Sequence, residues 1–157
     1  MKTVFRNAAI ALLAIAGLAA LAPSASAAPS RIWGGAGFND LGQSTVGFKV
    51  QNGRAKIISL QILLACTDTQ DGTESTLAFS MGRGPTDTLN QNRFRFRFDQ
   101  ESSGRDADVK LNGRMGSNGR GIARANITSV GRDFETGAVI ERCQGSSNIP
   151  IRRGPAS

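Results

Sequence analysis

Six consecutive residues, Arg93–Phe98, alternate arginine and phenylalanine without a break. Successive side chains of a β-strand point to opposite faces, so this alternation predicts a half-buried strand. Phe94, Phe96 and Phe98 would lie in the core, and the arginines would face solvent. A helix would scatter both residue types around its surface, so the pattern excludes an amphipathic helix here.

Most of the chain has the same character, with short alternating stretches separated by Gly- and Asn-rich turns. The other stretches expected as strands are Ser44–Gln51, Arg54–Cys66, Ser75–Met81, Ala107–Met115, Arg120–Val130 and a last edge strand at Asn148–Arg153. Roughly seven to nine short strands at such spacings are typical of a sandwich or barrel. The sequence therefore predicts an all-β chain forming an antiparallel two-sheet sandwich of jelly-roll or Greek-key type. A small closed β-barrel is the alternative.

The connection between the first two of these strands can be interpreted from the two-residue period. A two-residue turn would place Phe48 opposite Ile57 and would send the apolar residues that follow Ile57 to the wrong face. A three-residue loop, Gln51–Gly53, would instead place Val46 opposite Ile58. We therefore predict the three-residue loop, with a positive φ and a bulge at Gly53.

The N-terminal residues have the composition of a signal peptide. Lys2 and Arg6 precede an uninterrupted apolar run, Ala8–Ala22, and Ala25-Ser26-Ala27 has the small-x-small pattern of a cleavage site. The run is shorter than the roughly 20 residues that an anchor helix needs. We expect a signal peptide at 1–27, cleavage after Ala27, and one secreted domain at 28–157 without a membrane span.

The chain has two cysteines, Cys66 and Cys143, both in the expected mature region. An even pair in an exported protein predicts a disulfide. Two free thiols, one of them a nucleophile, are the alternative, but a catalytic thiol needs a nearby base and the chain has no His.

The arginine side of the alternating strand is a candidate anion-binding row. Arg93, Arg95 and Arg97 would stand about 6.8 Å apart and could follow an anionic polymer. The competing interpretation pairs them with acidic residues of the following strand, Arg97 standing opposite Asp108 or Asp106. Nucleic acid would also require aromatic platforms on the same face, and here the aromatic residues alternate inward.

Acidic residues suggest two further sites. Asp68, Asp71 and Glu74 lie close together in a predicted loop, and carboxylate oxygens are ligands for calcium, although the spacing is not that of an EF-hand. A carboxylate pair for glycoside hydrolysis could come from these three or from Asp106 and Asp108. Triads that need His are excluded, and no motif predicts a cofactor or a catalytic residue.

The sequence also resembles small secreted bacterial two-cysteine β-sandwich proteins of unknown function. The residues that carry the resemblance are Val46-Gly47-Phe48-Lys49-Val50, Asn52-Gly53, Cys66, Cys143-Gln144-Gly145 and the short strand Ile149–Arg152. It implies a disulfide-linked sandwich and no particular activity.

Three functions follow from these observations. The first is a non-catalytic secreted or envelope-associated module that binds an anionic cell-envelope polymer or another extracellular protein. The second is a carboxylate-based hydrolase of an extracellular polymer. The third is an anionic-polymer or nucleic-acid binder that uses the Arg93, Arg95 and Arg97 face. Without the predicted leader, 17 basic residues stand against 12 acidic ones, a net charge of +5 that is compatible with anionic partners.

Overall fold

The computed structural model describes residues 28–102 and 104–156, so the predicted signal peptide at 1–27 lies outside the described residues. The nine strands are β1 Arg31–Asn39, β2 Gly42–Gln51, β3 Arg54–Asp68, β4 Glu74–Met81, β5 Thr86–Thr88, β6 Arg93–Ser102, β7 Arg105–Met115, β8 Arg120–Arg132 and β9 Val139–Ala156. The predicted all-β class is confirmed for this part of the chain. It contains no helix long and apolar enough to span a membrane.

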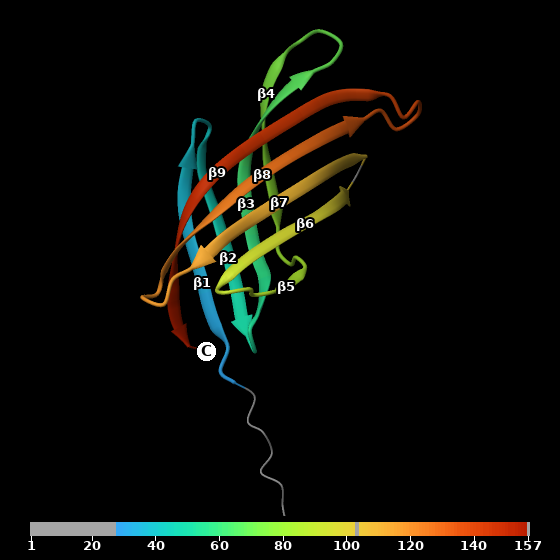
Figure 1. The fold of residues 1–157 in the computed structure, drawn as a ribbon. Helices are drawn as coiled ribbons and strands as arrows, with labels where there is room; N and C mark the ends of the chain where they lie inside the picture. The colour runs from blue at the N-terminus through green and yellow to red at the C-terminus, as the bar shows by residue number, and fades with distance from the viewer. Residues whose placement is uncertain (1–27, 103, 157) are drawn as a thin grey trace, which may run out of the picture.

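All nine strands belong to one antiparallel sheet with the order β4-β3-β2-β1-β9-β8-β7-β6, and β5 pairs with β3 off this path. Strands β6–β9 cross β1–β3 diagonally (Figure 1). We call these two groups of strands, β1–β3 and β6–β9, the two halves of the sheet. They are in contact, because the ring centroid of Phe48 in β2 lies 4.7 Å from that of Phe94 in β6. The sheet therefore folds over itself and encloses the core.

Strand β9 joins the two halves of the sheet at both of its ends. Residues 141–144 pair with β3 and residues 152–156 pair with β1, while β8 pairs with β9 along its length. The prediction of a short edge strand at Asn148–Arg153 is therefore wrong, because these residues belong to an 18-residue strand inside the sheet. Pro150 is tolerated because residues 145–151 pair only with β8, so this stretch of β9 lacks a second ladder.

The predicted three-residue loop between β2 and β3 is also wrong. The turn has two residues, Asn52 (φ 51°) and Gly53 (φ 69°), and Phe48 lies opposite Ile57. The change that brings the apolar residues of β3 to the core face was expected at the turn. It occurs instead inside the β2–β3 ladder, where the register shifts between Gly47 and Phe48. The extra residue is Ile58, which is only half-buried, and beyond it Val46 faces Leu60. Only the positive φ of Gly53 was predicted correctly.

The inner faces of both halves form one apolar core. Phe94 and Phe96 are each 3% exposed and Phe98 is half-buried, as the alternation predicted. Trp33 is buried near the start of β1. A Cβ at Gly113 would lie 2.5 Å from Cζ of Phe94, so glycine is required there to admit the ring. With the phenylalanines held inside, the odd-numbered residues of β6 must face outward.

Candidate functional site

The outer face of β6 and β7 carries a cluster of basic side chains. Phe96 pairs with Leu111 and Phe98 with Val109, so the apolar faces meet as the sequence predicted. Their register places Arg97 opposite Lys110, which corrects the expectation that an aspartate would stand there. Arg93 likewise stands opposite Arg114. Like charges directly across a ladder are destabilising, so these pairs do not contribute to the stability of the sheet.

The acidic residues near this cluster neutralise little of its charge. Asp108 lies diagonal to Arg97, and one of its oxygens is 3.7 Å from the guanidinium. The same carboxylate is 3.5 Å from Nζ of Lys110, so one anion serves two cations. Asp87 accepts a 2.8 Å hydrogen bond from the backbone N–H of Arg95 rather than from its side chain. The predicted pairing of the β6 arginines with acidic residues of the next strand is therefore found only at Arg97.

An open groove of about 980 Å³ lies between the outer face of β6–β8 and the loop before β6, and we call it the basic groove. Its lining residues include Arg93, Arg95, Arg114 and Arg124. None of these four guanidiniums has an ion pair or hydrogen bond within the described residues. Arg124 joins the cluster from β8, where it stands opposite Asn112 of β7. The groove can therefore offer four free guanidiniums to one anionic ligand.

The opposite end of the same outer face is acidic. Asp99 stands opposite Asp108, and Glu101 stands opposite Asp106. Asp106 accepts a 3.0 Å hydrogen bond from Nε of Arg132. Charge on this face is therefore segregated along the strands, with the cations gathered at the end where the groove opens.

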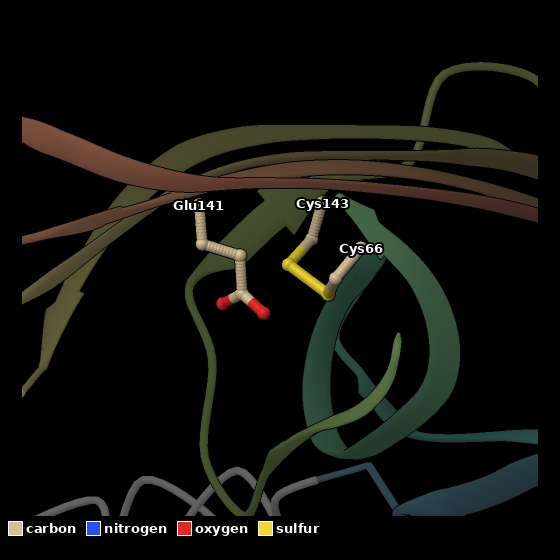
Figure 2. Close-up of side chains that lie close together, drawn as sticks. All are labelled: Cys66, Glu141 and Cys143. Carbon is tan, nitrogen blue, oxygen red and sulfur yellow. A yellow bond between two sulfur atoms is a disulfide. The ribbon is translucent and has the colours of Figure 1, made fainter. Parts of the chain in front are cut away.

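Cys66 and Cys143 form the predicted disulfide between directly opposed residues of β3 and β9, with Cα atoms 4.0 Å apart. Figure 2 shows the carboxylate of Glu141 beside the bond. These three residues are the only cluster of metal-ligating side chains within the described part of the chain. Arg105 forms an ion pair with the carboxylate of Glu141 and donates a 3.3 Å hydrogen bond to Sγ of Cys143. With both sulfurs bonded to each other, the cluster is a structural contact.

The predicted calcium loop uses its carboxylates to hold its own backbone. Asp68 accepts hydrogen bonds from the backbone N–H groups of Gln70 and Asp71, at 2.7 and 3.3 Å. Asp71 accepts a 2.8 Å bond from the N–H of Thr73, and this bond lowers the pKa of Asp71 below its usual value. Glu74 lies in β4 opposite Thr67. These three side chains do not gather into a metal-ligating cluster within the described residues.

The carboxylates considered for hydrolysis lie outside the clefts. Asp106 and Asp108 project from the outer face of β7 and bind neighbouring cations. Asp68, Asp71 and Glu74 belong to the loop between β3 and β4 and to its edge. The main clefts of the described residues are each lined by at most one carboxylate. The arrangement does not bring two carboxylates together across a cleft, as glycoside hydrolysis requires.

Three residues of the basic cluster were predicted from the sequence, and Lys110, Arg114 and Arg124 were missed as members. Lys110 and Arg114 alternate with the buried Val109, Leu111 and Met115, so their exposure was foreseeable. Arg124 alternates in the same way within β8. The register that places them beside Arg93–Arg97 depends on pairing between strands, which no local pattern reports.

Comparison with protein families, curated proteins and solved structures finds no match to this chain.

Proposed function

We propose that this chain is a secreted or envelope-associated, non-catalytic β-module that binds an anionic polymer in the basic groove. The proposal joins the binding module expected from the sequence with the arginine face expected as an alternative. It rests on one observation: four arginines line a single open groove, and none of them has an acidic partner within the described residues. The resemblance to small secreted two-cysteine proteins is consistent with such a role but does not specify a ligand.

A guanidinium whose donors are bonded inside the fold has no need of a ligand, whereas the donors of these four bond no other group within the described residues. A planar guanidinium presents donors that match carboxylate, phosphate and sulfate groups in pairs. Several cations in one hollow also raise the local concentration of anions through their summed field. A bound anion would relieve the repulsion between Arg93 and Arg114, which stand opposite each other.

The scaffold that best suits this role is a β-sandwich whose two layers are the two halves of the continuous sheet. In that arrangement β6, β7 and β8 present their outer face on a rigid layer, and the apolar core supports it from behind. Two layers are favoured over a closed barrel because the ladders of the described residues do not include a β4–β6 pair, although β3 and β9 pair at one end.

The test is polyanion binding by the mature chain, residues 28–157, with inorganic polyphosphate as the probe. We expect affinity to fall steeply with salt, and the slope of log affinity against log salt to decrease by about one for each cation removed. The variants are Arg95→Ala and Arg114→Ala. The matched control is Arg142→Ala, which removes an exposed arginine from β9, opposite Val130 near the acidic end of the same face. Equal effects of all three variants, or binding that does not respond to salt, would overturn the proposal.

A further inference from the structure

A second cleft adjoins the basic groove on the outer face of the sheet. It has a volume of about 400 Å³, and Arg124 lines both openings. The β1–β2 hairpin forms one side of the cleft and β8–β9 the other, and its other polar lining residues are Asn39, Asp40, Asn126, Ser146, Ser147 and Asn148. Phe38, which is 74% exposed, also lines it. A ligand lying in the basic groove could therefore continue into this cleft.

The asparagines of this face differ from those that hold turns. Asn39 accepts a hydrogen bond from the N–H of Gly42 in the hairpin and donates one to the carbonyl of Leu63 in β3, and Asn118 accepts one from the N–H of Arg120 at the β7–β8 turn. Asn112, Asn126 and Asn148 have no side-chain hydrogen bond within the described residues. Each of these amides can donate and accept at once, so each can bind a hydroxyl group in either role.

In one row across the strands the cations and the amides alternate, because Arg95, Asn112, Arg124 and Asn148 stand side by side on β6, β7, β8 and β9. In the neighbouring row two cations, Arg97 and Lys110, are followed by Asn126 and Ser146. Adjacent strands are about 4.8 Å apart and successive outward residues are about 6.8 Å apart. The row that begins at Arg95 therefore presents charged and neutral hydrogen-bonding groups in turn, at separations comparable with the width of a sugar ring.

A ligand that matches this alternation must carry anionic groups and hydroxyl groups in turn. Chains of acidic sugars have that chemistry, and the exposed ring of Phe38 offers an apolar surface to the C–H face of a sugar. Single-stranded nucleic acid matches less well, because its successive bases stack on a series of exposed aromatic rings, and within the described residues Phe38 is the one exposed ring that lines either cleft. The aromatic residue lining the basic groove is Phe94, which is 3% exposed and packs into the core.

We infer that the cleft between the β1–β2 hairpin and β8–β9 recognises sugar hydroxyls, and that the anionic polymer bound by this protein is an acidic polysaccharide. The inference rests on the proposed function, because the basic groove must first hold the polymer. It adds a site with a different chemistry, in which Asn126 and Asn148 hydrogen-bond the neutral part of the same ligand.

The experiment compares two probes that carry the same number of charges: a polyuronate oligosaccharide and a linear polyphosphate. The protein is the mature chain, and affinities are measured by calorimetry at one salt concentration. We expect the polyuronate to bind about tenfold more tightly than the polyphosphate, the gain from two additional hydrogen bonds. The double variant Asn126→Ala/Asn148→Ala should lose that tenfold advantage and leave polyphosphate affinity unchanged.

Two further variants make the result specific. Phe38→Ala should weaken only the polyuronate, by about threefold, through loss of apolar contact. Gln70→Ala, which removes an exposed amide from the β3–β4 loop, should change neither affinity. All substituted side chains are exposed, so unchanged unfolding midpoints would exclude misfolding as the cause.

The outcomes separate the two proposals. Equal affinity for both probes, or a loss of both in the asparagine variant, would overturn the inference and leave the proposed function standing. Tighter binding of single-stranded DNA than of a polyuronate of equal charge would identify nucleic acid instead and overturn it as well. Failure of every polyanion to bind in a salt-dependent way would refute the proposed function itself.

Discussion

Arginines occur at both ends of the β7–β8 pair, and their surroundings differ. At the disulfide end Arg105 binds Glu141 and Sγ of Cys143, while Arg132 binds Asp106. At the groove end Arg114 and Arg124 lack such partners within the described residues and line an open hollow. The same residue type therefore stabilises the fold at one end and stays available for a ligand at the other. The bonded partners of an arginine, rather than its residue type, distinguish the structural arginines from those that line the groove.

In the turns at the disulfide end, polar side chains and backbone groups likewise have partners within the fold. Asp133 accepts hydrogen bonds from the backbone N–H and the hydroxyl of Thr136, both at 2.8 Å. The loop between β3 and β4 is tied to the start of β9, because Thr69 N–H donates a 2.9 Å bond to the carbonyl of Ile140. Several charged and polar groups at this end are therefore bonded within the fold, whereas the four groove arginines have no such partner within the described residues.

The largest expected difference between the ends comes from the disulfide. The double variant Cys66→Ala/Cys143→Ala removes a bond between residues separated by 77 positions, and we expect unfolding free energy to fall by about 4 kcal/mol. Denaturant unfolding measures the loss. Polyphosphate affinity, measured below the unfolding transition, should change little because the groove lies at the other end. A loss under 1 kcal/mol, or a groove that fails with the disulfide, would contradict this division.

The next largest effect should come from Arg105. Arg105→Met keeps the apolar stem but leaves the half-buried carboxylate of Glu141 without its cation. We expect a loss of about 1 kcal/mol, since both side chains keep some contact with solvent. Thermal or denaturant unfolding checks it, with Arg142→Met as the exposed control. Equal stability of the two variants would show that the ion pair contributes nothing.

Substitution at Arg114 should have the opposite sign. Arg114→Gln relieves the repulsion from Arg93, so we expect a gain of about 0.3 kcal/mol in unfolding free energy together with weaker polyanion binding. Arg124→Gln is the matched variant, because Arg124 faces Asn112 and Asn148 instead of a cation. It should weaken binding without the gain in stability. A loss of stability at Arg114 would mean that the arginine has a structural role.

The smallest expected effect is the change in the stability contribution of Asp133 at low pH. Hydrogen bonds from the backbone and side chain of Thr136 lower the pKa of Asp133 below its usual value. A lowered pKa means that the ionised group stabilises the fold above its unfolded pKa and that this contribution disappears as pH falls through the folded value. Asp133→Asn keeps the acceptor oxygen but cannot titrate. The stability difference between wild type and variant should be constant above about pH 5 and shrink toward acid, as measured by unfolding midpoints. Parallel pH profiles would contradict the assignment.

Local patterns predicted much of the scaffold. Alternation placed Phe94 and Phe96 in the core, and the even cysteine count predicted the disulfide. The turn after β2 was mispredicted because the β2–β3 ladder is not continuous: the extra residue Ile58 moves the following apolar residues to the core face within the strand. The alternation changes phase at Ile57-Ile58, from odd-numbered to even-numbered buried residues, and this change fits a bulge within the strand as well as a longer turn before it.

The candidate site divides in the same way. The period of two determined that Arg93, Arg95, Arg97, Lys110, Arg114 and Arg124 would point outward, because their apolar neighbours have to be buried. Only the tertiary structure decided that they meet around one groove and that one aspartate serves two of the cations. Register and the contact between distant strands depend on the packing of the whole core, and a one-residue shift would have given these arginines different partners.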